Sequence, residues 1–283
     1  MTALQALVLA VVQGLTEFIP VSSSAHLAIV PWLLDWGAPN VAFDVLLHLG
    51  TLLSLIAYFR RDLSVLIGAW LRSLGRLLTG RGLRALVEDE HARLAWLLLA
   101  GCVPTAIIGF TLKHQFESAF QHPSWIAVFL IITGVWLVIA QRVRPGAKES
   151  PTTAVKDALL VGLAQGIAIA PGISRSGATI GMGLLCGLNR QFAPRFAFLL
   201  AIPAIVGAAV FKLPELRQGA HAVAAGPAII GLVASAVSGY LAIMLVMRVV
   251  REGRLDRFAY YCWLVAVAVL VAVALGVRPA MMQ

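Results

Sequence analysis

Six uninterrupted apolar runs, each near the length that crosses a bilayer, constrain this chain more than any other feature. They are approximately Phe43–Tyr58, Leu94–Leu112, Ile126–Ala140, Phe196–Phe211, Pro227–Met247 and Tyr260–Val277. A helix of about 20 apolar residues spans the hydrocarbon core, where its backbone polar groups must be satisfied internally. Only 12% of the residues are charged, far fewer than in a typical soluble domain. We therefore predict an all-α integral membrane protein with a single membrane domain over residues 1–283.

Two further apolar stretches, approximately Leu4–Leu34 and Ala158–Leu188, are interrupted near their middle by proline, glycine and serine. Such residues inside apolar sequence end or kink a helix, and the pieces that remain are too short to span alone. We expect each stretch to form a re-entrant helical hairpin that enters and leaves the bilayer by the same face. Irregular backbone at membrane depth is tolerated only where protein or a wet cavity covers it.

The basic residues sort onto one side of this layout. That side receives Arg60, Arg61, Arg72, Arg76, Arg81, Arg84, Arg93, Arg142, Arg144, Lys148, Lys156, Arg190, Arg195, Arg248, Arg251, Arg254 and Arg257, and the other receives mainly Lys113, Lys212 and Arg217. The positive-inside rule makes the first side cytoplasmic, so the first hairpin opens outward. We expect an amphipathic piece between Arg60 and Arg93 on the inner leaflet. Without a separate basic domain, the net charge of +9 does not indicate nucleic-acid binding.

An internal repeat relates the two interrupted stretches at a nearly constant offset. Gln13-Gly14 recurs as Gln165-Gly166, Pro20–Ala25 as Pro171–Ala178, and Ala42–Ile56 as Arg195–Ala209. Three predicted spans lie between the copies, so the second copy is inverted, and the halves are about 1–145 and 150–283. Inverted repeats with broken helices are typical of transporters. A lipid flippase or small-anion transporter is therefore the alternative to an enzyme.

Polar side chains gather at both interruptions. The first contains Gln13, Glu17, Ser22, Ser23, Ser24 and His26, and the second contains Gly172, Ser174, Arg175, Ser176 and Thr179. An ionisable residue at membrane depth is costly and is a functional candidate by default. If the two hairpins meet, a carboxylate, an imidazole and a guanidinium share one site.

The chemistry of these residue types suits phosphoryl transfer. The glycine turn before a helix start leaves free N–H groups for an anion, and an arginine fork matches phosphate oxygens. Hydroxyls can donate hydrogen bonds or supply a nucleophile. Ser22 and Ser24 can equally bond backward to carbonyls within a helix. We expect His48 and Asp44 to be packing or rim residues.

These motifs also carry a family resemblance. QGLTEFIPVSSSAH resembles the first signature of the bacterial undecaprenyl-diphosphate phosphatase family, and PGISRSGAT resembles the second. FDVLLHLGT is also similar to the family, and the likeness runs from end to end of the chain. It implies a plasma-membrane enzyme of the bacterial envelope, associated with bacitracin resistance, with an outward-facing site. Such an enzyme hydrolyses undecaprenyl diphosphate to undecaprenyl phosphate and inorganic phosphate, recycling the carrier for cell-wall synthesis.

The resemblance also implies roles for individual residues. Glu17 matches the essential acid, Ser23 the proposed nucleophile, His26 the essential histidine and Arg175 the phosphate-binding arginine. It implies a divalent cation, Mg²⁺ or Ca²⁺, and leaves room for a homodimer. Gln13 stands at a position that is Glu or Gln in the family, so Glu17 is the one acid of the first motif and the expected metal ligand. The sequence does not choose among Ser23, His26 and water as the nucleophile.

We expect the remaining polar residues of the two interruptions to contact the substrate. These are Gln13, Ser22, Ser24, Gly172, Ser174, Ser176 and Thr179.

Overall fold

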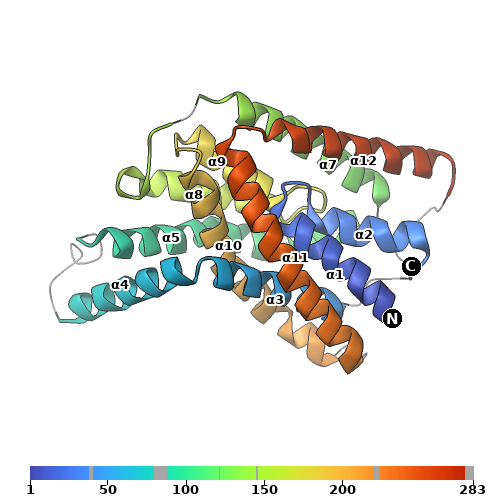
Figure 1. Ribbon diagram of the computed structural model, residues 1–283, viewed down its shortest axis with the longest axis horizontal. Coiled ribbons are helices and arrows are strands. Elements are labelled where there is room, and N and C mark those ends of the chain that lie inside the picture. Colours follow the sequence, from blue (N-terminus) through green and yellow to red (C-terminus); the bar gives the residue numbers. More distant parts are fainter. Residues whose placement is uncertain (38–40, 80–87, 121, 145, 219–222, 278–283) are drawn as a thin grey trace.

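The structure is a computed structural model that describes residues 1–37, 41–79, 88–120, 122–144, 146–218 and 223–277 (Figure 1). Its regular elements in that part of the chain are helical. They are α1 (Ala3–Phe18), α2 (Ser23–Leu34), α3 (Val41–Tyr58), α4 (Arg60–Leu78), α5 (Glu90–Thr111), α6 (Lys113–Phe120), α7 (Pro123–Arg142), the 3₁₀ turn η2 (Ser150–Thr152), α8 (Val155–Ile167), α9 (Arg175–Leu185), α10 (Phe192–Gln218), α11 (Ala225–Arg251) and α12 (Asp256–Ala274).

Six of these helices are long and apolar enough to cross a membrane. They are α3, α5, α7, α10 over Phe192–Lys212, α11 and α12. Each contains most of one predicted apolar run, so the predicted set of six spans is confirmed. Many of their large apolar side chains are exposed, including Ile107, Phe110, Leu241 and Leu264. Exposed apolar surface of this extent is what a bilayer covers.

The two interrupted stretches each fold as helix, turn and helix. The four helices, α1, α2, α8 and α9, have 16, 12, 13 and 11 residues. Each is shorter than the roughly 20 residues that cross hydrocarbon. Their turns lie near the middle of the molecule, where α9 contacts both α1 and α10 (Figure 1). Re-entrance itself depends on the bilayer and stays a prediction.

Each hairpin begins with a helix that packs closely on a spanning helix from the other half of the chain. Helix α1 packs on α11, and α8 packs on α5. Gly14 makes the first contact possible, because a Cβ there would lie 2.7 Å from the backbone oxygen of Ser235. Gly162 does the same for the second, since its Cβ would collide with the carbonyl of Gly101. Helices α7 and α12 pair along one side of the molecule (Figure 1).

The segment after α3 contains the amphipathic piece expected from the sequence. Helix α4 is not among the six spans, and it runs beside α5. Its first turn is tied to α10, because the Arg195 guanidinium donates to both carboxylate oxygens of Asp62, at 3.2 and 2.8 Å. Of the basic residues expected in this segment, Arg81 and Arg84 lie outside the described residues. The short helix α6 was not predicted.

Candidate active site

The last turn of α1 presents Glu17 at the centre of the molecule. Gln13 and Glu17 are four residues apart on one helical face, and Gln13 Nε2 donates to Glu17 Oε2 at 3.0 Å. The helix ends directly afterwards because Ile19, which precedes Pro20, is extended at φ −62° and ψ 131°. The Glu17 side chain is only 4% exposed. A carboxylate buried to this degree requires charged or hydrogen-bonding partners.

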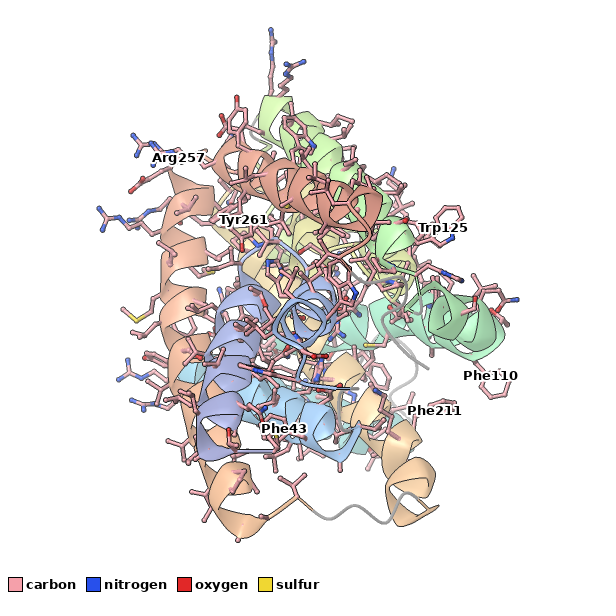
Figure 2. The ribbon with its side chains drawn as sticks, turned by 90° about the vertical axis from the view of Figure 1, so that its right-hand side faces the viewer. Phe43, Phe110, Trp125, Phe211, Arg257 and Tyr261 are labelled. Atoms are coloured by element: carbon pink, nitrogen blue, oxygen red, sulfur yellow. The ribbon has the colours of Figure 1, made fainter. Side chains whose placement is uncertain are left out.

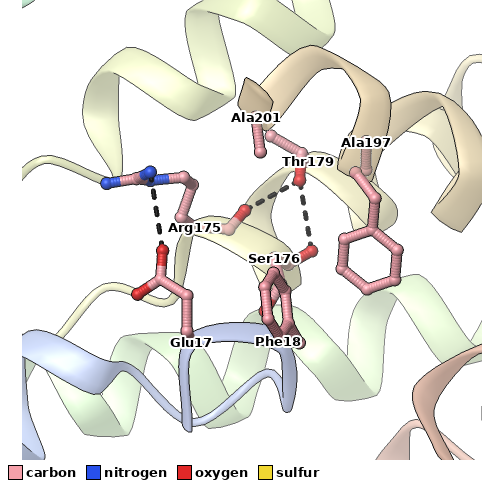
Figure 3. A pocket seen from close by; sticks show the side chains of 8 residues that line it. Glu17, Phe18, Arg175, Ser176, Thr179, Ala197 and Ala201 are labelled. Atoms are coloured by element: carbon pink, nitrogen blue, oxygen red, sulfur yellow. Dashed lines mark hydrogen bonds and ion pairs between the residues drawn. The ribbon is translucent and has the colours of Figure 1, made fainter. Parts of the chain in front are cut away.

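Helix α9 supplies the charged partner. Gly172 adopts a φ of +103°, and Ser174 then caps α9 by accepting a hydrogen bond from the N–H of Gly177 at 3.1 Å. Arg175 is therefore the first residue of the helix. Its Nη1 lies 3.6 Å from Glu17 Oε1 (Figure 3). The structure thus brings the acid of the first motif and the arginine of the second into one ion pair.

Helix α2 supplies the hydroxyl. Ser23 is its first residue, and Ser23 Oγ donates to Glu17 Oε2 at 2.6 Å. His48 approaches the same oxygen from α3, with its Nε2 at 3.8 Å. Its Nδ1 donates to the backbone oxygen of Asp44 at 2.8 Å. Four helices therefore direct side chains at one carboxylate.

A small pocket opens beside this ion pair. Glu17, Arg175, Ser176 and Thr179 line one part of it, and Phe18, Ala197, Phe198 and Ala201 line the rest (Figure 3). The apolar part comes largely from α10. The pocket therefore has a charged side and an apolar side.

The ring of His26 forms its hydrogen bonds outside the Glu17 cluster. Its Nδ1 donates to the backbone oxygen of Ser22 at 2.7 Å, and its Nε2 is 2.9 Å from the hydroxyl of Tyr261 on α12. The two rings are stacked, with centroids 5.6 Å apart. Figure 2 shows Tyr261 on the part of α12 that adjoins the first hairpin. Both ring nitrogens are thus engaged away from Ser23.

Most of the other predicted substrate contacts form hydrogen bonds within their own hairpins, and Gly172 bonds to α7. Ser22 Oγ and Ser24 Oγ are 3.1 Å apart, and Ser174 Oγ and Ser176 Oγ are 3.2 Å apart. Thr179 Oγ1 donates to the backbone oxygen of Arg175 at 2.8 Å. The carbonyl of Gly172 accepts from Thr133 on α7. Contact of these residues with a substrate stays a prediction.

The described part of the site offers too few oxygen ligands to hold a divalent cation by itself, so a bound cation would need further ligands from the substrate or from water. No group of three His, Cys, Asp or Glu side chains in the described ranges is arranged to hold a metal ion. Glu17 is the one carboxylate, and the buried Gln13 Oε1 has no hydrogen-bond partner among the described residues. Mg²⁺ commonly binds one or two protein oxygens plus substrate phosphates. The residues therefore fit a cation shared with a bound diphosphate.

Two residues of this region were not expected from the sequence. His48 was assigned to packing or to the rim, although it lies against Glu17. The available signal was the presence of an ionisable side chain, His48, within an otherwise apolar predicted span. Tyr261 was not singled out, because a tyrosine near the end of an apolar run is ordinary at a membrane interface.

Comparison with known proteins shows the family to which the chain belongs. The family described as bacitracin resistance protein BacA matches residues 6–268. A protein named undecaprenyl-diphosphatase from Nocardioides sp. is 42% identical over 274 residues, which cover 97% of each chain. One of the same name from Geobacter metallireducens is 42% identical, covering 95% of this chain and 98% of the relative. Another, from Pelotomaculum thermopropionicum, is 40% identical, covering 97% and 98%. This multi-pass membrane protein therefore belongs to the bacitracin resistance protein BacA family.

Proposed function

We propose that this protein hydrolyses undecaprenyl diphosphate to undecaprenyl phosphate and inorganic phosphate, which recycles the lipid carrier for cell-wall synthesis. The names of its relatives support this activity. The observation that carries it is the meeting of Ser23 and Arg175 on Glu17, beside a wall of apolar side chains. A nucleophile, a base and a phosphate-binding cation therefore adjoin the apolar wall of one pocket.

Arg175 binds the terminal phosphate of the substrate in this proposal. Its Nη1 is buried and has no hydrogen-bond partner among the described residues, apart from the longer ion pair with Glu17. Charge-assisted hydrogen bonds from arginine to phosphate are strong and directional. The incoming phosphate therefore accepts a hydrogen bond from Arg175 Nη1, which lacks such a partner in the described protein. The N-terminus of α9 further stabilises the negative charge of the phosphate.

Ser23 attacks the terminal phosphorus, and Glu17 accepts the hydroxyl proton through the existing 2.6 Å hydrogen bond. A bond forms between Ser23 Oγ and phosphorus while the bridging P–O bond breaks, so undecaprenyl phosphate leaves. Glu17 passes that proton to the departing bridging oxygen. Water then attacks the phosphoserine while giving a proton to Glu17, the Oγ–P bond breaks to release inorganic phosphate, and Glu17 returns the proton to Ser23 Oγ. Of the two candidate side chains, Ser23 donates to a carboxylate, whereas His26 bonds to the Ser22 backbone and to Tyr261.

A divalent cation is part of the proposal. Glu17 and Gln13 Oε1 would hold it together with the diphosphate. When bound, it would neutralise charge on the phosphate oxygens.

The membrane setting follows from the charge distribution and the substrate. We place the protein in the bacterial plasma membrane with the first hairpin open to the outer face, because the basic residues gather at the opposite side. The isoprenyl tail remains in the bilayer, and the buried Phe18 and Phe198 side chains line the pocket beside the diphosphate. Assembly as a homodimer also remains part of this proposal.

The test is phosphate release from undecaprenyl diphosphate, or a shorter isoprenyl diphosphate, by the purified protein in detergent. We expect release that depends on Mg²⁺ or Ca²⁺ and is abolished by chelator. Arg175→Ala should reduce turnover by about 10²–10³-fold, because one phosphate-stabilising group is lost. Arg254→Ala is the matched control, since Arg254 is exposed and pairs with Glu252, and it should leave turnover unchanged.

The inverted repeat supports a lipid flippase as the second candidate. A folded wild-type protein that releases no phosphate in detergent would contradict the phosphatase. The next assay would then be movement of fluorescent isoprenyl phosphate across sealed vesicles, because transport needs two compartments and hydrolysis does not.

A further inference from the structure

The turn that carries Ser23 has an unusual backbone. Ser22, the residue before it, adopts φ +70° and ψ 98°, in the left-handed half of the map that glycine favours. Ser22 is also buried, at 3% exposure. A strained, non-glycine residue persists only when its surroundings hold it in place. The surroundings of Ser22 therefore determine where the Ser23 hydroxyl lies relative to Glu17.

His26 is the side chain that holds this turn. Its Nδ1 donates to the Ser22 carbonyl at 2.7 Å, and its own backbone N–H donates to the same oxygen at 3.3 Å. A carbonyl oxygen can only accept, so Nδ1 carries the proton and the neutral ring has its lone pair on Nε2. The Tyr261 hydroxyl, 2.9 Å away, donates to that lone pair. The ring is thus fixed at both ends.

Helix α12 also anchors the turn at a second point. The thiol of Cys262, next to Tyr261, lies 3.8 Å from the backbone oxygen of Pro20. The following residue, Trp263, donates from Nε1 to the backbone oxygen of Ile131 on α7, at 3.2 Å. Three consecutive residues of α12 therefore connect the first hairpin to α7, which makes α12 a rigid support for the Ser22 turn.

From this geometry we propose that Tyr261 is a positioning residue for the nucleophile, acting through His26 and the Ser22 turn. His26 in turn contributes by holding the backbone, through its Nδ1–H donor, rather than by taking the proton of Ser23. The proposal rests on the proposed function, since it assigns a role in that same reaction. It adds α12, which neither sequence motif includes, to the helices that build the site.

The first part of the test is steady-state hydrolysis of isoprenyl diphosphate by Tyr261→Phe, which removes the hydroxyl and keeps the stacked ring. We expect kcat to fall about 10-fold or more with KM within about twofold, because misplacement of a reacting group by about 1 Å can cost as much as 10²-fold. Tyr260→Phe is the matched control, since Tyr260 is exposed and packs on Trp263; it should match the wild type. An unchanged kcat in Tyr261→Phe would overturn the role of the hydroxyl.

The second part separates positioning from proton transfer at His26. In His26→Asn the side-chain amide can stand where Nδ1–H stood, whereas in His26→Gln it reaches toward the Nε2 position. Neither side chain titrates. We expect His26→Asn to keep turnover at least about 10-fold above His26→Gln and His26→Ala, because only Asn restores the donor to Ser22. Equal loss in all three variants would overturn the proposal and assign the chemistry to the imidazole.

Thermal unfolding in detergent accompanies these assays, and a variant is compared only when its Tm is within a few degrees of wild type. If the wild type itself releases no phosphate, the proposed function fails. If the wild type is active and Tyr261→Phe or His26→Asn behaves against expectation, this inference alone fails.

Discussion

In the hairpin of α1 and α2, Ser22 caps α2 and the next residue, Ser23, reaches Glu17. In the hairpin of α8 and α9, Ser174 caps α9 and the next residue, Arg175, reaches the same carboxylate. Equivalent positions of two similar hairpins therefore carry a hydroxyl and a guanidinium. We propose that the two halves are an inverted repeat. The equivalent positions then diverged into Ser23 in one hairpin and Arg175 in the other, and the site uses both side chains.

Each of the two turns contains one residue with a positive φ, but the residue type and its position differ. The second hairpin places its positive φ at Gly172, which leaves Ser174 in an ordinary extended conformation at φ −74°. The first has no glycine in its turn, and Ser22 takes the positive φ itself, at a cost of roughly 1–2 kcal/mol. Helix α7 supports the second turn through Thr133, and α12 supports the first through Tyr261 and His26. The strained turn is the one that carries the proposed nucleophile.

The largest expected effect comes from the residue where the two hairpins meet. Glu17→Gln removes the proton acceptor of Ser23 and the counter-charge of Arg175, so turnover should fall by about 10²–10⁴-fold. The measurement is phosphate release by the purified protein. Glu252→Gln, which removes a carboxylate paired with Arg248 and Arg254, is the control and should retain full activity. Normal turnover in folded Glu17→Gln would mean that the hairpins do not share a reaction centre.

The second effect tests the glycine turn. Gly172→Ala introduces a Cβ 2.6 Å from the backbone oxygen of Ile126, at a φ that side chains rarely adopt. We expect a loss of about 3 kcal/mol or more in the free energy of unfolding, seen as a large drop in Tm. Gly37→Ala has a similar positive φ, +79°, but open space around it, so it should cost only about 1 kcal/mol. Equal Tm values for the two variants would contradict the close contact between the turn and α7.

A third effect compares equivalent glycines of the two hairpins. A Cβ on Gly14 would lie 2.7 Å from the Ser235 carbonyl oxygen and 2.8 Å from the Gly239 nitrogen, both backbone atoms. A Cβ on Gly166 would lie 2.7 Å from Ile108 Cδ1, the end of a flexible side chain. Gly14→Ala should therefore destabilise by about 1–3 kcal/mol and Gly166→Ala by less, since only Ile108 can rotate away. The opposite order of Tm values would show that the packing of α1 on α11 is not the tighter one.

The smallest expected effect concerns the helix caps. Ser174 Oγ accepts from Gly177 N at 3.1 Å, whereas Ser22 Oγ accepts from Ala25 N at 3.5 Å, near the limit for a hydrogen bond. Ser174→Ala should lower the free energy of unfolding by about 1 kcal/mol and Ser22→Ala by a few tenths. Thermal melts of the two purified variants check this order. A larger Tm loss in Ser22→Ala would indicate that its hydroxyl does more than cap α2.

Much of the fold was predictable because hydropathy and helix-breaking residues are local signals in the sequence. The six spans and both helix breaks follow from apolar length, proline and glycine alone. The amphipathic helix α4 followed from its basic residues between apolar ones. The boundaries were less predictable: α5 begins at Glu90, earlier than the apolar run, because Asp89 caps it by accepting from the N–H groups of His91 and Ala92.

The site was predictable only in part, because its remaining contacts are tertiary. The meeting of Glu17, Ser23 and Arg175 agrees with a shared site inferred from the two motifs. The orientation of His26 toward Tyr261 is set by α12, far away in sequence, and no local pattern indicates it. His48 carried a signal, but a histidine in an apolar run does not reveal which neighbour it faces. A serine or threonine such as Ser22 or Thr179 can cap a helix, bond to a backbone carbonyl or contact a ligand, and only its tertiary surroundings decide which.

The most direct test of the two-hairpin site is the affinity of purified variants for undecaprenyl diphosphate, measured alongside turnover. We predict that Ser23→Ala binds the lipid within about threefold of wild type while hydrolysis is lost, because the first hairpin supplies the reacting group. Arg175→Ala should bind at least about tenfold more weakly, because the second hairpin supplies the phosphate-binding cation. Undiminished binding by a folded Arg175→Ala protein would contradict this division of roles between the hairpins.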